Sequence, residues 1–423
     1  MTALDLLTTL VGRSLVVSDG RDRYRLLDTL RAFARSRLAD GAHGLDLGLA
    51  ERRLAAWIRT VVIACDPYSH GPLPDAWPRV RLDLPSIRAA LEWAFGPEGD
   101  RPTGARIVGA LAGTLALSGE FAEASRWLTL AAGVDSDDET MATVLRGVAV
   151  VDLYQGRFDE ALRAAERAHE HATRTGVEEL VASCAITFGS AAWGLGELGR
   201  SSALLRDAAA TFDRVGDVRG RGFALARLAR TLSDLADPDA VETATAAVDD
   251  LEASQDDWVG VVALDHLAYA LLATGDHRAA AVRAEQAITL AERIGSFSGH
   301  LGALSLLGRI RLAEGDLGAA RDVQQRVVTA ALRVRNLGAV TDGLDGLADV
   351  FIAAGQHALA AMAAGAADSM RRRSGVVVTR RRATRAEARL ALLGAELGPE
   401  ALDDRLRAGR SLTPLDALAL APS

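Results

Sequence analysis

The chain contains no lysine, and all 48 of its basic residues are arginine. A Walker A loop needs a lysine that reaches the nucleotide phosphates, and Schiff-base catalysis needs a lysine amine. Both kinds of site are therefore excluded within these 423 residues. This one absence removes a whole set of nucleotide-dependent and covalent mechanisms.

Cysteine is nearly as scarce, with only Cys65 and Cys184 present. Two cysteines far apart in sequence do not indicate a disulfide framework, and they fit a reducing cytoplasm. The chain has no run of 18 apolar residues and no leader pattern, so neither a membrane span nor a signal peptide is expected. A net charge of −8 argues against direct nucleic-acid binding. These features predict a cytoplasmic protein that has no membrane contact.

The hydrophobic fraction is 49% but the aromatic fraction only 4%, so the apolar content is mainly alanine and leucine, which favour helices. A short kernel recurs: a small residue, a polar step and a second small residue five positions on. Five clear copies begin at Gly119, Gly156, Gly275, Gly315 and Gly355, and two degenerate copies begin at Gly196 and Ala236. These seven anchors are spaced by 37, 40, 40, 39, 40 and 40 residues. A fixed period in this range indicates stacked supersecondary units.

Residues 259–294 show what one unit contains. Gly275-Asp276 predicts a turn, in which glycine ends one helix and aspartate caps the next. The first helix carries Val262, Leu264, Leu267, Ala268 and Leu271, and the second carries Ala280, Ala284, Ala287, Ile288 and Ala291. This pattern resembles tetratricopeptide repeats, whose period is about 34, with longer helices. The fold class predicted is all-α: a tetratricopeptide-like superhelix preceded by a short partial winged-helix segment.

The segments before the repeats have a different character. Residues 1–40 predict a helix, a β-hairpin around Asp19-Gly20 and a helix capped by Asp28 or Thr29, which together make a partial winged helix. Residues 41–60 predict a helix, 66–78 a proline-rich loop, and Leu84–Phe95 a helix with Pro85 in its first turn. We expect three regions: 1–40, a helical linker with the loop at 41–103, and the repeat array at 104–423.

Three motifs stand at residues 10–34, 84–95 and 406–420, the last with Thr413 as an N-cap and Pro414 at the first helical position. They resemble segments of large bacterial ATP-binding regulators of the LuxR-family and antibiotic-regulatory-protein-like STAND ATPase kind. The chain departs from the family at Gly12-Arg13, where an Asp-Lys pair is usual, and at Leu84-Pro85-Ser86, where the usual start is acidic. The resemblance implies the C-terminal sensor region of such a regulator, without its ATPase core or a DNA-binding domain.

Several motifs have a chemical and a structural interpretation. Gly194–Gly199 has the form G-x-G-x-x-G, but it falls on the repeat lattice, and the βαβ context of a dinucleotide site is missing. His169, His171, His266 and His277 lack zinc-ligand spacing. The acidic turns at 135–139 and at Asp249-Asp250 with Asp256-Asp257 lack calcium-loop spacing and fit helix starts better. No catalytic, cofactor-binding or metal-binding residue is predicted, and no cofactor.

The one strong basic cluster comprises eight arginines between 371 and 389: Arg371, Arg372, Arg373, Arg380, Arg381, Arg382, Arg385 and Arg389. No aromatic residues are interleaved with them, which favours a solvated surface or a contact with an acidic partner over a nucleic-acid site. Trp193 and Trp258 are interpreted as packing residues of the repeats.

These observations favour a non-enzymatic repeat module in bacterial signalling or transcriptional regulation. First helices of successive units would line a concave surface that holds a protein, a peptide or a small effector. The alternative is a truncated or split sensor half of an ATP-dependent transcriptional regulator, whose P-loop ATPase lies upstream of Met1 or in another chain. An enzyme is not expected, because no nucleophile, metal or acid–base constellation has the required pattern. Because a partial winged helix leaves apolar faces uncovered, residues 1–40 are predicted to pack on 41–100 or to dock a separate protein.

Overall fold

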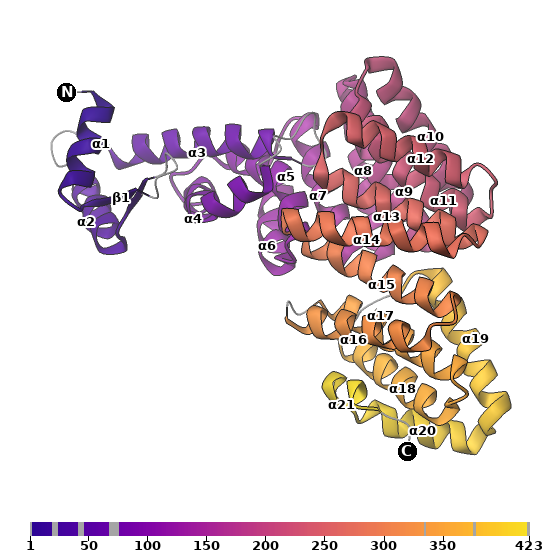
Figure 1. Ribbon diagram of the computed structural model, residues 1–423. Helices are drawn as coiled ribbons and strands as arrows, with labels where there is room; N and C mark the ends of the chain where they lie inside the picture. Colours follow the sequence, from indigo (N-terminus) through magenta and orange to yellow (C-terminus); the bar gives the residue numbers. More distant parts are fainter. Residues whose placement is uncertain are drawn as a thin grey trace.

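The computed structural model describes residues 2–18, 24–40, 46–66, 76–333, 336–374 and 378–420. Figure 1 shows an N-terminal arm that extends from a curved body of paired helices. The predicted all-α architecture with tetratricopeptide-like repeats is confirmed.

The arm begins with a helix, a hairpin and a second helix. These are α1 (Ala3–Gly12), β1 (Val16–Ser18), β2 (Tyr24–Leu26) and α2 (Asp28–Ala39), with β1 and β2 antiparallel. The hairpin turn predicted at Asp19-Gly20 lies outside the described residues. The capping prediction for α2 was wrong: Leu27 is the N-cap and makes no side-chain bond to the helix.

Two long helices, α3 (Leu47–Ala64) and α4 (Ala76–Ala94), join the arm to the body. The predicted helix start at Leu84 was wrong, since α4 begins at Ala76 and contains Pro85 in its interior. Proline removes one backbone hydrogen bond, but Val80, Ile87 and Leu91 on either side of it are all buried. Their burial holds the helix together across the proline. Residues 67–75 of the predicted loop lie outside the described part.

Helix pairs make up the body. Seven pairs follow one another: α5 (Arg101–Leu117) and α6 (Phe121–Ala132), α7 (Asp138–Tyr154) and α8 (Phe158–Thr175), α9 (Glu178–Leu195) and α10 (Leu198–Val215), α11 (Val218–Leu235) and α12 (Ala240–Ser254), α13 (Asp257–Thr274) and α14 (His277–Ile294), α15 (Phe297–Ala313) and α16 (Leu317–Arg333), α17 (Leu337–Ala353) and α18 (His357–Ser374). The chain then continues through α19 (Arg380–Leu397), α20 (Pro399–Arg410) and α21 (Pro414–Leu418). Thr413 caps α21 as predicted.

The anchor residues turn the chain between the two helices of a unit. All seven have a positive φ, between 71° and 88° for the six glycines and 55° for Ala236. Glycine adopts this left-handed conformation freely, whereas alanine does so at a cost of about 1 kcal/mol. At Gly275-Asp276 the aspartate accepts a hydrogen bond from the Ala279 amide at 3.0 Å, as predicted. The sequence period is therefore a period of left-handed turns.

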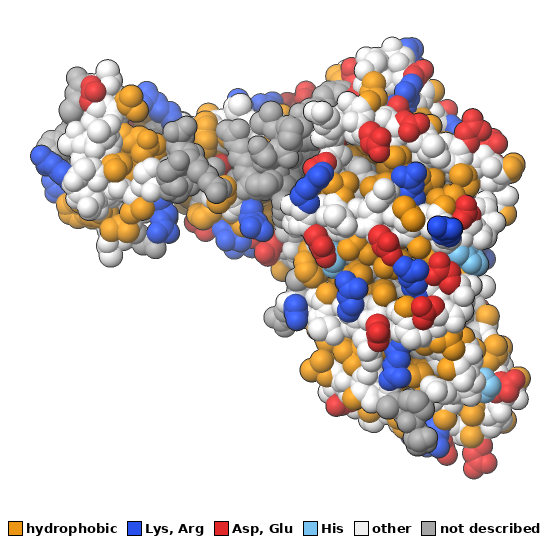
Figure 2. Space-filling view, in the orientation of Figure 1, with side chains coloured by type: hydrophobic (Ala, Val, Ile, Leu, Met, Phe, Trp, Pro, Cys, Tyr) orange, Lys and Arg blue, Asp and Glu red, His pale blue; other side chains and the backbone are white. Residues whose placement is uncertain are grey.

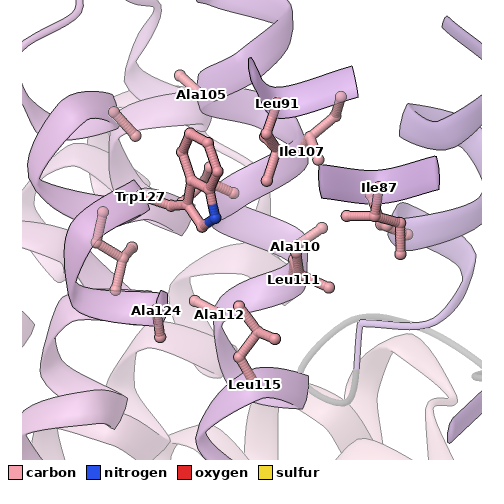
Figure 3. Packing of buried hydrophobic residues seen from close by; sticks show 14 of the residues in the cluster. Ile87, Leu91, Ala105, Ile107, Ala110, Leu111, Ala112, Leu115, Ala124 and Trp127 are labelled. Carbon is pink, nitrogen blue, oxygen red and sulfur yellow. The ribbon is translucent and has the colours of Figure 1, made fainter. Parts of the chain in front are cut away.

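Small side chains hold neighbouring helices close. The five residues predicted to line the second helix of residues 259–294 are all buried: Ala280, Ala284, Ala287, Ile288 and Ala291. Figure 3 shows the same packing at the start of the array, where Trp127 of α6 lies among residues of α4 and α5 such as Leu91 and Ala105. One apolar core thus continues from α3 and α4 into the first repeats. No helix in the described ranges is long and apolar enough to cross a bilayer.

Candidate functional site: the interior of the superhelical turn

The array curls until its sixth unit meets its first. The Ser298 hydroxyl at the start of α15 donates a hydrogen bond to the Leu117 carbonyl at the end of α5, at 3.3 Å. Inside this turn lies a cavity of about 590 Å³, lined by first helices from several units. Its size lies within the range of ~300–1,000 Å³ typical of ligand pockets.

Residues at the same position of successive repeats line the cavity. Val150, Ser190, Arg230, Tyr269 and Arg309 each stand six residues before an anchor, and each lines the cavity wall. Sequence reasoning did not single them out as site residues. The signal was available, because the period that defines the anchors also defines which position of each first helix faces inward.

Aromatic side chains form part of the wall. Trp193, Phe223, Trp258 and Tyr269 line the cavity, and the rings of Phe223 and Trp258 lie 5.5 Å apart. Both tryptophans had been interpreted as packing residues, and the structure shows that they also face the interior. Asp234 accepts hydrogen bonds from the Trp193 indole at 2.8 Å and from the Tyr269 hydroxyl at 2.6 Å. These two bonds fix the aromatic side chains in place.

Three arginines of α11 and α15 reach the same interior. The Arg230 guanidinium lies 3.6 Å from the Tyr269 ring centroid, the Arg309 guanidinium 5.3 Å from that centroid, and Arg227 stacks on Phe223 at 5.3 Å. Over the described residues, Arg227 and Arg309 have no carboxylate within 4.0 Å, and Arg230 reaches Asp234 only at 4.0 Å.

The pKa values of two of these arginines reflect this surplus of positive charge. Burial, together with the nearby cations of Arg385 and Arg230, lowers the pKa of Arg309 to about 9. Burial also lowers the pKa of Arg230 to about 10, against the opposing effect of Asp265. Both guanidinium groups remain charged at neutral pH.

Buried polar atoms without a protein partner are concentrated here. Among the described residues, eight such side chains occur, and five of them line the cavity: Gln155, Thr187, Arg227, Arg230 and Asp265. Buried polar groups in proteins are almost always satisfied. Their concentration in one cavity makes this cavity the candidate functional site.

The histidines do not come together. His266 lies buried in the cavity wall with Nδ1 at 2.7 Å from the Ala226 carbonyl, and burial lowers its pKa well below the ordinary value. His171 instead pairs with Asp138 at 2.6 Å, and the His169 ring lies beside Phe188. In the described part of the chain, no group of His, Cys, Asp and Glu side chains could hold a metal ion.

The arginine cluster of residues 371–389 lies differently from the prediction. A solvated surface was wrong for Arg371 and Arg389, whose side chains are only 16% and 4% exposed and are held by aspartates of this chain. Arg381 and Arg382 are exposed as predicted, although each also pairs with an aspartate. Arg389, only 4% exposed, donates to Asp349 and to Asp345, each at 2.8 Å.

Two arginines at the start of α19 reach across the turn to the first helices. Arg381 pairs with Asp234 of α11, and Arg382 pairs with Asp342 of α17. The start of α19 thus lies beside the cavity, where Thr379 and Arg382 are among the lining residues. Figure 2 shows acidic and basic side chains interspersed over the repeat array.

The remaining motifs are structural. Gly196 of the G-x-G-x-x-G stretch ends α9 in the left-handed conformation, so the structural interpretation is confirmed. Asp137 and Asp256 cap helices as predicted, and hydrogen bonds from Thr140 hold the pKa of Asp137 down at about 2. The helix-start interpretation was wrong for Asp250, which lies in the last turns of α12 and pairs with Arg221 at 2.6 Å.

The paired helices, left-handed turns and closed superhelix define a tetratricopeptide-like helical-repeat protein. No family model and no curated protein matches the chain by sequence. Similar solved structures include a Rap protein complexed with competence and sporulation factor, which is 12% identical with a TM-score of 0.55, covering 86% of this chain and 99% of that one. This likeness supports the fold.

Two further solved structures are less similar to this chain, with lower TM-scores. A STAND protein with a tetratricopeptide repeat sensor from Pyrococcus horikoshii is 14% identical with a TM-score of 0.47, covering 84% of this chain and 56% of that one. NprR in complex with its cognate peptide NprX is 12% identical with a TM-score of 0.47, covering 66% of this chain and 81% of that one.

Proposed function

We propose that this chain is a non-enzymatic recognition module of bacterial signalling or transcriptional regulation that binds a peptide inside its superhelical turn. The observation that carries the proposal is the concentration of unsatisfied polar side chains in one aromatic-lined cavity. A ligand with hydrogen-bonding groups along its length satisfies such a wall, and a peptide backbone is one. The fold likeness to a Rap protein complexed with competence and sporulation factor agrees with this proposal.

The test blocks the cavity without touching its charges. Ser190 is a half-buried residue of the wall, and Ser190→Trp fills the interior with an indole. Val282 of α14 is 49% exposed and lies outside the cavity lining, so Val282→Trp adds the same side chain elsewhere. The wild-type chain and both variants are incubated with a random hexapeptide pool, and retained peptides are identified by mass spectrometry after size exclusion.

We expect the wild type and Val282→Trp to retain the same peptides and Ser190→Trp to retain none. Equal circular dichroism spectra and elution volumes control for folding. If the wild type retains no peptide, or if Ser190→Trp retains as much as Val282→Trp does, the proposal is wrong.

A second function, the sensor half of a LuxR-family or STAND-type ATP-dependent regulator, is favoured by the arm. Its apolar side chains are exposed, with Leu4 at 69% and Phe33 at 64%, and α2 makes few contacts with α3. An ATPase domain encoded upstream or by another chain would cover this face. The coding DNA tests this second function. A P-loop sequence in frame before Met1, or in an adjacent gene, supports the sensor-half function, and the absence of both contradicts it.

A further inference from the structure

Positive side chains outnumber the available carboxylates inside the turn. Three guanidinium groups, those of Arg227, Arg230 and Arg309, share the Asp265 carboxylate, which acts on all three from beyond ion-pair distance. Asp234 reaches Arg230 only at 4.0 Å and is already engaged by Trp193, Tyr269 and Arg381. Two further acids of α17, Asp342 and Asp349, are paired with Arg382 and Arg389. The interior therefore has room for additional negative charge.

The arrangement suits one or two carboxylates better than a polyanion. Arg230 and Arg309 both lie against Tyr269, so their donors converge on one region, and planar guanidinium groups match carboxylate geometry. A nucleic acid or a polyphosphate would meet Asp265 and Asp342, which stand in the same wall. Those two acids instead suit the N–H groups of an adjoining peptide backbone, and one oxygen of Asp265 has no partner within the described protein.

We propose that the interior of the turn binds a peptide bearing a carboxylate side chain, and that Arg227, Arg230 and Arg309 receive that carboxylate. This inference rests on the proposed peptide-binding function and names its ligand class. Aromatic neighbours pack beside the ligand, while these three arginines select a ligand that carries negative charge. Loss of one arginine that donates to a buried carboxylate removes about 1.5–3 kcal/mol of binding free energy, a tenfold to hundredfold change in affinity.

The experiment compares two matched hexapeptide pools, one with glutamate fixed at the third position and one with glutamine there, both amidated at the C-terminus. A third pool carries glutamine at that position and a free C-terminus, which separates a side-chain carboxylate from a terminal one. Retention on the wild type is measured by size exclusion and mass spectrometry. We expect at least tenfold more retention from the glutamate pool than from either glutamine pool.

Arg309→Gln removes one charge from the wall, and Arg309→Lys keeps the charge but loses the planar donors. Arg278→Gln removes the same charge from an exposed position of α14 outside the cavity. We expect the glutamate preference to fall at least tenfold in Arg309→Gln, to fall less in Arg309→Lys and to persist in Arg278→Gln. Arg230→Gln provides a second variant of the cavity wall if Arg309→Gln fails to fold.

The outcomes separate the two proposals. Retention of peptides without a glutamate preference, or a preference that survives in both Arg309→Gln and Arg230→Gln, overturns the carboxylate inference and leaves peptide binding intact. A preference for the pool with a free C-terminus assigns the arginines to a chain terminus and overturns the side-chain assignment. No retention from any pool overturns both proposals.

Discussion

A buried ion pair links the end of the arm to the second and third repeats. Arg146 of α7 donates to Asp66 at 2.5 Å and to the Ser183 hydroxyl of α9 at 2.7 Å. The side chains of Arg146 and Asp66 are only 3% and 6% exposed. Removing one partner takes away the opposite charge that the other faces at 2.5 Å in a buried site, which costs about 3–5 kcal/mol. We expect Asp66→Asn to lower the free energy of unfolding by that amount, although the substitution barely changes the volume.

The assay is urea unfolding followed by circular dichroism at pH 7. Because repeat arrays unfold in parts, the first transition is the one to compare. Arg146→Met should be similarly costly, while the double variant should lose about 2 kcal/mol less than the sum of the single losses, since it removes both charges of the pair. Arg293→Gln, which breaks the exposed pair with Asp257, is the control and should cost less than about 1 kcal/mol.

Two results would refute this reasoning. The first is an Asp66→Asn variant as stable as Arg293→Gln, which would mean that water or another group solvates Arg146. The second is strict additivity of the single changes in the double variant, which would mean that the two side chains do not act as a pair.

Three further predictions concern other parts of the array. Burial lowers the pKa of His266, so the unfolded chain binds more protons below about pH 6.5 and the unfolding free energy should fall as pH drops through that value; His266→Gln should flatten this slope in pH-dependent urea titrations. Gly409 of α20 lies against the Met362 carbonyl of α18, where an added Cβ would collide, so Gly409→Ala should speed proteolysis of the C-terminal helices, whereas Gly199→Ala, in open space, should not. Arg389→Met should cost about 1–3 kcal/mol and raise hydrogen exchange across α19, because Asp345 and Asp349 lose a buried donor; unchanged exchange there would contradict the role given to this residue.

The period of the repeats could be predicted from sequence because each unit contains the residues that form its own turn. Even the degenerate anchor at Ala236 takes the left-handed conformation, since the flanking helices of its unit enforce it against the preference of the side chain. Conformational preferences of this kind depend on a few neighbouring residues, so they can be recognised from one sequence. The proline at position 85 shows their limit, because buried neighbours on both sides override the signal it carries.

The candidate site was harder to predict because its contacts join residues far apart in sequence. Nothing local to Arg381 identifies Asp234 as its partner, and the pair forms only because the array curves. The inward position six residues before each anchor was readable in principle. The cavity itself follows from curvature, which depends on small rotations between units that no single unit encodes.

The hydrogen bond between Ser298 and Leu117 has a consequence for kinetics. It joins the two ends of a superhelical turn, so the proposed peptide would enter either along the axis of the turn or after this contact between α5 and α15 opens. One hydroxyl–carbonyl bond contributes about 1 kcal/mol, so breaking it need not unfold any unit. Under the proposed function, Ser298 would therefore affect the rates of peptide binding and release, whereas side chains elsewhere on the cavity wall would set the affinity.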